Sequence, residues 1–328
     1  MMAKVLRVGP QASVQDLGRV GHRAIGVGTS GALDPFAGRV ANLLVGNDEG
    51  AALIEIALGN FRLRFEDERL ITWCGGDFDV EITERKVPGG HTCLVGAGEE
   101  IAIMNAKTGC RAWLAISGGI DVPRVLESRS TDLRAAFGGF NGRSLRGGDE
   151  LALGELPVAG REWMVLLREA RLSSWSAPRA WASTSMHHSV LRFIRGTDWK
   201  DFCDQTHQAL AEEKFTATQE ADRMGVRLDG PELKRKETSD LLSEAVTPGT
   251  LQVPPNGKPI LLLGDCQTIG GYPKIAHVIT VDLPIAAQLR PGDEVRFRET
   301  SIAQAHSLLL KRERDLERFR IGLGLKVA

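Results

Sequence analysis

The sequence predicts a mainly β protein made of two tandem β-barrels, with short helices and one C-terminal helix. Three observations support this prediction. Short apolar runs alternate with Gly- and Pro-rich turns, and 37 of the 328 residues are glycine. Motifs of the first half return in the second half at a nearly constant spacing. A long helical period is found only after residue 301. Since no segment has the character of an open sheet edge, closed or nearly closed barrels are the best prediction.

The first half is expected to consist mostly of short strands. The predicted strands span 4–8, 52–56, 61–65, 70–73, 93–95, 101–104 and 111–117. One helix interrupts them: Asp34 is a favourable N-cap, Pro35 suits the first helical position, and Gly46-Asn47 ends the apolar period. The segment 155–189 has no clear period, and we interpret it as the connection between the two halves.

A glycine pattern precedes this helix. Gly26-Val27-Gly28-Thr29-Ser30-Gly31 matches the dinucleotide fingerprint letter for letter. That fingerprint requires a repeating unit in which parallel strands alternate with helices. Because the rest of this chain alternates strands with turns, we reject a dinucleotide site.

The repeat relates the two halves residue by residue. Val5-Leu6-Arg7-Val8 resembles Val190-Leu191-Arg192-Phe193. The pairs Asp34 and Asp222, Arg39 and Arg227, and Asp77 and Asp265 are each 188 residues apart. A consistent register favours duplication of one β-rich unit. We therefore expect a first barrel domain over 1–185, a second over 186–300 and a helical tail over 301–328.

One stretch of the second half, 251–276, concentrates polar side chains. A strand at 251–253, a turn at Pro254-Pro255-Asn256-Gly257 and a buried strand at 260–263 lead into a polar loop. A further strand begins at Tyr272-Pro273-Lys274. Asp265, Gln267, Tyr272 and Lys274 should therefore cluster at one end of the sheet, where loops commonly carry binding chemistry. The competing interpretation is an ordinary polar hairpin tip.

Composition excludes several classes of protein. The net charge of −1 gives no general attraction to nucleic acid or to an anionic membrane, and we expect neither as a partner. No window is long and apolar enough to span a membrane. The five cysteines are odd in number and lack Cys-x-x-Cys spacing, which favours reduced thiols in the cytoplasm and no metal site.

Ordered motifs connect the chain to a known family. They are Gln15-Asp16-Leu17-Gly18-Arg19, Ser30-Gly31-Ala32-Leu33-Asp34, Ser128-Arg129-Ser130-Thr131-Asp132, Asp222-Arg223-Met224-Gly225, Gln252-Val253-Pro254-Pro255-Asn256-Gly257 and Gly270-Gly271-Tyr272-Pro273. Over about residues 4–300 the chain resembles the C subunit of 5-oxoprolinase, also called KipA or allophanate hydrolase subunit 2. This family is similar to part of the carboxyltransferase domain of urea carboxylase.

The resemblance implies a fold, partners and a reaction. The fold would be two cyclophilin-like β-barrels. The partners would be the KipI-like B subunit and a third component, the A subunit of 5-oxoprolinase, and the substrate would be a small molecule. The implied activity is that of an ATP-dependent amidohydrolase that opens the lactam of 5-oxoproline to glutamate. ATP with Mg²⁺ would be needed, held by this chain or by the complex, since the sequence has no phosphate-binding Gly-x-x-x-x-Gly-Lys loop. No covalently attached biotin is expected, because the sequence has no Met-Lys-Met site.

The candidate catalytic residues come from the polar stretch. Lys274 is the candidate cation for a carboxylate or phosphate, and Gln267 is a neutral amide that orients the substrate. Asp265 would position water or a metal ion, and Tyr272 would supply a phenol or a stacking face. Cys266 lies inside the same loop but has no sequence-adjacent base, so we expect an inert thiol and not a nucleophile.

The candidate substrate- and anion-binding residues come from both halves. They are Arg19, Ser30, Arg129, Ser130, Asp132, Asp222, Arg223 and Asn256. Three arginine–aspartate pairs, Arg129 with Asp132, Arg19 with Asp16 and Arg223 with Asp222, are possible anion clamps. For each pair the alternative is an internal salt bridge that holds a loop. Asp16 and Asp132 are more simply structural, because loop carboxylates often accept hydrogen bonds from backbone amides.

Three classes of function stay open at this point. The first is a component of 5-oxoprolinase. The second is a carboxyltransferase component of the urea carboxylase or allophanate hydrolase type, which receives carboxybiotin from a partner. The third is a regulatory protein that binds a KipI-like kinase inhibitor. Side chains from both halves are expected to meet in a shared anion-binding cleft.

Overall fold

The computed structural model describes residues 1–183, 189–237 and 241–326. By its contacts the chain divides into two units. Unit 1 comprises Met1–Arg19, Ser30–Ser185 and Asp315–Ala328, and unit 2 comprises Val20–Thr29 and Met186–Arg314. The expected domain bounds stay a prediction, and their boundary at 185 and 186 lies outside the described residues.

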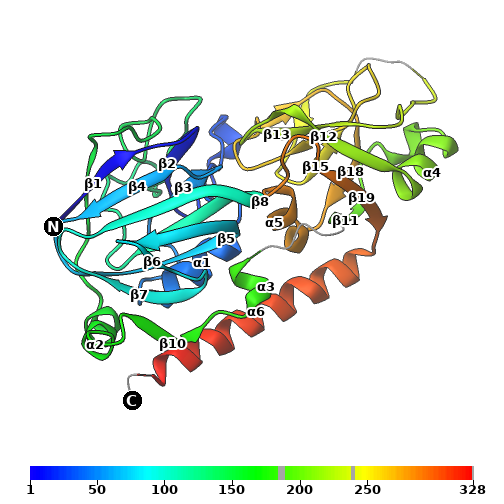
Figure 1. The fold of residues 1–328 in the computed structure, drawn as a ribbon. Helices are drawn as coiled ribbons and strands as arrows, with labels where there is room; N and C mark the ends of the chain where they lie inside the picture. The colour runs from blue at the N-terminus through cyan, green and yellow to red at the C-terminus, as the bar shows by residue number, and fades with distance from the viewer. Residues whose placement is uncertain (184–188, 238–240, 327–328) are drawn as a thin grey trace. The chain divides into compact units, whose positions relative to one another are not determined.

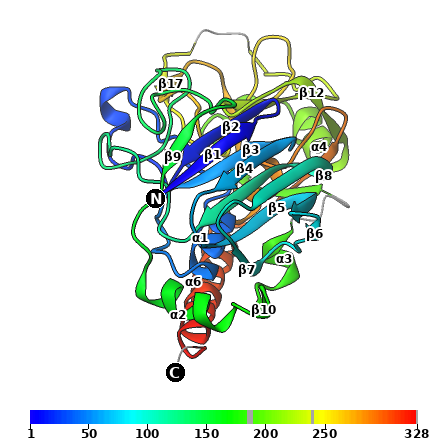
Figure 2. The same cartoon turned by 60° about the vertical axis from the view of Figure 1, so that its left-hand side comes forward.

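Unit 1 is built on a ten-stranded sheet (Figures 1 and 2). Its strands are β1 (Met2–Arg7), β2 (Gln11–Gln15), β3 (Leu53–Ala57), β4 (Phe61–Phe65), β5 (Arg69–Ile82), β6 (Arg85–Lys86), β7 (His91–Val95), β8 (Glu100–Ile116), β9 (Glu150–Ala152) and β10 (Leu172–Ser176). The hydrogen-bonded order is β10-β7-β5-β8-β4-β1-β9. In addition, β3 pairs with β8 and with β2, and β6 pairs with β5.

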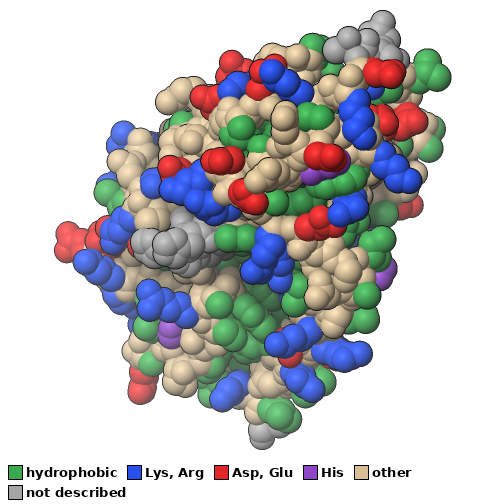
Figure 3. All heavy atoms as spheres, turned by 90° about the vertical axis from the view of Figure 1, so that its right-hand side faces the viewer, with side chains coloured by type: hydrophobic (Ala, Val, Ile, Leu, Met, Phe, Trp, Pro, Cys, Tyr) green, Lys and Arg blue, Asp and Glu red, His purple; other side chains and the backbone are tan. Residues whose placement is uncertain are grey.

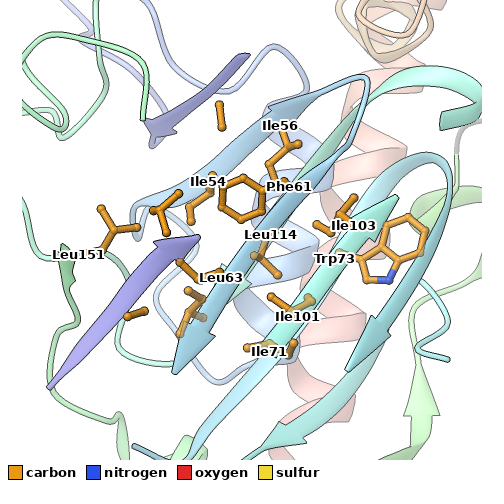
Figure 4. Close-up of a cluster of buried hydrophobic side chains, with 14 of the residues drawn as sticks. Ile54, Ile56, Phe61, Leu63, Ile71, Trp73, Ile101, Ile103, Leu114 and Leu151 are labelled. Carbon is orange, nitrogen blue, oxygen red and sulfur yellow. The ribbon is translucent and has the colours of Figure 1, made fainter. Parts of the chain in front are cut away.

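The core of unit 1 follows from strand alternation. In β4, Phe61, Leu63 and Phe65 are fully buried, whereas the arginines between them are exposed. Figure 4 shows such side chains from several strands packed into one apolar cluster. Burial of each large apolar side chain contributes about 1.5–3 kcal/mol, so this cluster is the main source of stability for the sheet.

Two strands of unit 1 are longer than the sequence suggested. β5 continues to Ile82, well past residue 73 where the predicted strand ends, and the two strands expected over 101–104 and 111–117 form the single strand β8. Gly75 explains the first difference: its φ is +136°, and a Cβ there would lie 2.3 Å from the carbonyl oxygen of Arg111. The pairing of β5 with β8 shifts register between Gly75 and Asp77, with the extra residues on β8, so the glycine leaves room for a bulge of the partner strand while β5 continues.

The helices of unit 1 were predicted in part. Helix α1 (Pro35–Leu44) begins as expected, because the Asp34 carboxylate accepts a hydrogen bond of 2.9 Å from the backbone N–H of Ala37. It packs against β5 and β8. The connection predicted over 155–189 contains α2 (Val158–Leu166), β10 and α3 (Arg179–Ala182). The pattern did not show α2, since only Gly160 and Trp163 of this helix are buried.

Unit 2 contains a closed seven-stranded barrel. Its strands, in spatial order, are β11 (Ser189–Arg195), β18 (Lys274–Val278), β15 (Thr250–Gln252), β16 (Ile260–Leu262), β13 (Gly225–Asp229), β12 (Lys214–Ala221) and β19 (Glu294–Glu299). The two-residue strands β14 (Glu244–Ala245) and β17 (Ile269–Gly270) pair outside the barrel. The short helices are η1 (Arg23–Ile25), η2 (Trp199–Asp201), α4 (Asp204–Glu212), η3 (Thr280–Asp282) and α5 (Leu283–Ala286).

Ring contacts among Phe193, Phe215 and Phe297 hold the interior of the barrel. The centroids of Phe215 and Phe297 are 5.5 Å apart in an edge-to-face arrangement, and those of Phe193 and Phe297 are 6.4 Å apart. The mainly β class with short helices is therefore confirmed, and a closed barrel is present.

The 188-residue spacing does not relate equivalent elements. Asp34 caps a helix, whereas Asp222 lies in the turn between β12 and β13, where it accepts hydrogen bonds from the backbone N–H groups of Met224 and Gly225. Aspartate suits both places because its carboxylate satisfies free N–H groups. The recurrence thus reflects similar local chemistry at two different elements.

The predicted C-terminal helix is confirmed as α6 (Ile302–Gly324). Leu316 and Leu323 are buried, and the ring of Phe319 lies 5.6 Å from that of Trp181 in unit 1. On the outer face of the helix, Arg320 forms an exposed pair with Glu317. On the face drawn in Figure 3, basic and acidic side chains are likewise interspersed. Within the described residues, no helix is long and apolar enough to cross a membrane.

Candidate functional site

The polar loop 263–273 of unit 2 is fixed by an arginine from far away in the sequence. Arg23, in the short segment that joins unit 2, donates hydrogen bonds to the carbonyl oxygens of Val246 and Gln267, the latter at 2.9 Å. The same nitrogen lies 4.0 Å from Sγ of Cys266. Sequence reasoning missed Arg23, because no local pattern signals a contact across 244 positions.

Asp265 and Arg223 form a buried ion pair at this loop. The guanidinium of Arg223 donates to both carboxylate oxygens, at 2.8 and 3.0 Å. Their side chains are only 4% and 6% exposed. Asp222, the partner suggested by the sequence, accepts backbone hydrogen bonds in its own turn, and an anion clamp of Arg223 with Asp222 stays a prediction. A two-pronged pair in this setting holds the loop onto the β12–β13 turn.

Lys274 is enclosed by carboxylates. Its ammonium lies 3.0 Å from Glu244 and 3.4 Å from Asp198, and its side chain is 9% exposed. The Asp198 carboxylate also accepts a hydrogen bond of 2.7 Å from the backbone N–H of Lys274. The positive charge proposed for an anionic substrate is thus shared with two protein carboxylates.

A chain of side-chain amides runs beside Tyr272. Gln267 donates from Nε2 to Oε1 of Gln252, and Gln252 donates from Nε2 to the carbonyl oxygen of Tyr272, both at 3.3 Å. Gln252 is 1% exposed. It belongs to one of the family motifs but was not among the residues expected at the site. The feature of the sequence that could have indicated Gln252 as a site residue is its position two residues before the Pro254-Pro255 turn.

Two adjacent cavities share Tyr272. One, of about 450 Å³, is lined by Gln219, Glu220, Ala221, Asp222, Met224, Gly225, Arg227, Gln252, Ile260, Leu262, Gln267 and Tyr272. The other, of about 780 Å³, is lined by Pro254, Pro255, Pro273 and neighbouring residues of unit 2. The structure therefore brings Asp222, Gln267 and Tyr272 of the predicted set to one cavity, which we call the amide pocket. Asp265 and Lys274 lie outside its lining.

Asn256 lies apart from the amide pocket. It is exposed in the turn between β15 and β16, where its Oδ1 accepts a hydrogen bond from the backbone N–H of Lys258. It lines a smaller cavity of about 230 Å³.

In unit 1, Asp16 is the centre of a structural hydrogen-bond network. Its carboxylate accepts from the backbone N–H groups of Gly18 and Arg129 and from the hydroxyls of Ser128 and Ser130. A carboxylate with this many donors fixes the loops that carry them. This is the structural role that the sequence favoured for Asp16.

Arg19 and Arg129 of unit 1 bind groups of the surrounding loops. Arg19 is 1% exposed, donates to the carbonyl oxygens of Val125 and Ser130, and stacks over the ring of Phe137. Arg129 donates to the carbonyl oxygen of Val122 and pairs with Asp121.

Asp132 and Ser30 are the remaining candidates of unit 1. Asp132 accepts from the backbone N–H groups of Arg134 and Ala135, which agrees with the structural role that the sequence favoured, and a clamp with Arg129 stays a prediction. Ser30 has a positive φ of 52° and is 5% exposed. Its hydroxyl is buried and has no hydrogen-bond partner among the described residues. The expectation that residues of both halves meet in one cleft stays a prediction.

The thiol pKa values are shifted in opposite directions. Burial raises the pKa of Cys266, in agreement with the inert thiol expected from the sequence, while nearby Arg23 opposes that rise. Burial also raises the pKa of Cys74 and Cys93. In contrast, a hydrogen bond with Thr206 at the start of α4 lowers the pKa of Cys203.

Whether this chain or its complex would hold Mg²⁺-ATP stays a prediction. No three His, Cys, Asp or Glu side chains in the described part of the chain are grouped as a metal ion would require. The buried cations Arg223 and Lys274 are already paired with carboxylates. We therefore assign no step of nucleotide chemistry to this chain. The amide pocket instead offers amides, a phenol and a carboxylate, which suit a small polar molecule.

Comparison with known proteins places this architecture in a family. The model of the carboxyltransferase domain, subdomain A and B, matches residues 25–299. The chain is 35% identical to the C subunit of 5-oxoprolinase from Escherichia coli over 97% of its own length and 96% of that protein. It is 30% identical to urea amidolyase of Lachancea kluyveri, of which it covers 18%. The crystal structure of Kluyveromyces lactis urea carboxylase superposes with a TM-score of 0.87 at 28% identity, over 97% of this chain and 29% of that one. The chain therefore belongs to the family of carboxyltransferase subdomains A and B, together with the C subunit of 5-oxoprolinase.

Proposed function

We propose that this protein is one component of an ATP-dependent 5-oxoprolinase that opens 5-oxoproline to glutamate. The observation that carries the proposal is the 35% identity to a 5-oxoprolinase C subunit across nearly the whole of both chains. The match to urea amidolyase, by contrast, covers under a fifth of that protein. The partners would be the KipI-like B subunit and the A subunit, and Mg²⁺-ATP would be bound by the complex.

The lactam is a poor electrophile, so its carbonyl must be activated before water attacks. Phosphorylation of the carbonyl oxygen would do this, and the resulting negative charge calls for preorganised donors. The contribution we assign to this chain is to bind and orient the amide group in the amide pocket. Gln267 and Tyr272 line that pocket, and Asp222 supplies a carboxylate beside them.

The test is a preparation of all three subunits assayed for ATP hydrolysis with and without 5-oxoproline. We expect ATP turnover only when 5-oxoproline is present. Equal ATP hydrolysis with and without 5-oxoproline would refute the proposed activity.

A second candidate is a carboxyltransferase component that works with a biotin-bearing partner. The match to the carboxyltransferase model and the structural similarity to urea carboxylase favour it. The same preparation, supplied with a biotin carboxylase, a biotin carrier and labelled bicarbonate, separates the two candidates. Incorporation of label into urea, without hydrolysis of 5-oxoproline, would support this second function.

A further inference from the structure

We propose that the amide pocket recognises the adjacent N–H and C=O groups of a lactam or ureide through Gln267, whose amide is oriented by Gln252. This inference rests on the proposed function for its substrate class. It assigns a role to Gln252 and a direction to each hydrogen bond of the pair.

The orientation starts from a backbone carbonyl. The Tyr272 carbonyl oxygen can only accept a hydrogen bond, so Gln252 must present its NH₂ group there, at 3.3 Å. Oε1 of Gln252 then faces Gln267, which must present its own NH₂ group, again at 3.3 Å. Since Gln252 is almost fully buried, reversing its amide would place two acceptors face to face without water to relieve them. The amide of Gln267 therefore has one orientation.

The backbone around this pair is held independently. Arg23 fixes the Gln267 carbonyl at 2.9 Å, so the backbone from which the side chain extends is anchored. Gly270 provides the space for both amides: a Cβ at this position would lie 2.8 Å from Nε2 of Gln252 and 3.4 Å from Nε2 of Gln267. The absence of a side chain at this position therefore leaves the space that both amide groups occupy.

The oriented amide matches one ligand chemistry. With one N–H bound to Gln252, Gln267 can offer its second N–H and its Oε1 to the pocket that it lines. This donor and acceptor complement a C=O and an N–H on the same edge of a ligand. The lactam of 5-oxoproline has this edge because its ring holds the amide cis, and urea has it on either side.

Arg227 can distinguish the two ligands, 5-oxoproline and urea. It lines the same pocket and pairs with Glu220 at 2.8 Å, with both side chains more than half exposed. Such a pair is weak and can be exchanged for another carboxylate. The carboxylate of 5-oxoproline can take the place of Glu220, whereas urea has no such group.

The first test measures binding to the full chain by calorimetry. The probes are 5-oxoproline, the lactone analogue in which oxygen replaces the ring N–H, and urea. We expect the lactone to bind roughly 10- to 100-fold more weakly than the lactam, since its ring oxygen would face Oε1 of Gln267. Arg227→Met should weaken 5-oxoproline and leave urea unchanged. Equal binding of lactam and lactone, or no binding of either amide probe, would overturn the proposal. Tighter binding of urea than of 5-oxoproline would identify a ureide as the ligand.

The second test uses turnover of the preparation that contains all three subunits. Gln252→Leu and Gln267→Leu should each raise KM for 5-oxoproline roughly 10-fold or more. Gln208→Leu, on the exposed face of α4, is the matched control and should leave KM unchanged. Gly270→Ala should also raise KM, because it crowds both amides. If both leucine variants kept the wild-type KM, the inference would fail and the proposed activity would stand. If the lactam bound selectively but was never turned over, the proposed activity would fail and the inference would stand.

Discussion

Replacing Asp265 with asparagine tests whether this residue holds the loop of unit 2. Asparagine keeps the shape of the side chain but removes the charge that faces Arg223 at 2.8 Å. Both side chains are at least 94% buried, so water cannot replace the lost carboxylate. Breaking a buried pair on one side typically costs about 3–5 kcal/mol, and we expect a loss of this size in the free energy of unfolding.

The assay is urea denaturation followed by circular dichroism. Asp229→Asn is the control, because Asp229 forms an exposed pair with Lys258 and its loss should not move the midpoint measurably. The double variant Arg223→Met with Asp265→Leu removes both charges together and should recover most of the lost stability. The reasoning is refuted if Asp265→Asn shifts the midpoint no more than the control, or if the double variant is less stable than the single one.

Two further predictions follow from pKa shifts. Burial lowers the pKa of His277, so below about 6.5 the unfolded state binds a proton that the folded state resists. Stability should therefore be fully present above pH 6.5 and fall as the pH drops below it, and His277→Gln should reduce that slope in denaturation curves between pH 7 and 5. The hydrogen bond with Thr206 lowers the pKa of Cys203, so iodoacetamide at neutral pH should label this thiol before Cys266, as peptide mass spectrometry can show.

Each of these predictions has a matched control. His306, exposed on α6, should give the wild-type pH dependence when replaced by glutamine. An unchanged slope in His277→Gln would show that the acid sensitivity arises elsewhere. Cys203→Ser should remove the fast phase of labelling. Labelling of the buried Cys266 at the same rate would contradict the assignment.

Much of the fold could be predicted from the sequence. Alternation at Phe61, Leu63 and Phe65 located β4 to the residue, and Asp34 with Pro35 located the start of α1. These signals are local, since they depend on strand period and on capping of free N–H groups. The predicted strand 70–73 stopped short of Gly75, because a glycine in sequence does not reveal whether the chain turns or the partner strand comes close.

The candidate site could be predicted only in part. Gln267 and Tyr272 were chosen from the polar loop, and both line the amide pocket. The pairing of charges was not predictable: proximity in sequence suggested Asp222 for Arg223, but the partner is Asp265, 42 residues away. Adjacent loop residues usually point in different directions, and their carboxylates are often used by nearby backbone amides.

What the sequence alone determined is the class of fold, the family and the loop that carries Gln267. Strand period, turn residues and ordered motifs are local patterns, so they can be recognised in the sequence without coordinates. What only the tertiary structure decided is which groups remain available for chemistry. The barrel strand β15 carries Gln252, which orients the amide of Gln267, and Arg23 reaches the same loop from a segment outside the barrel strands.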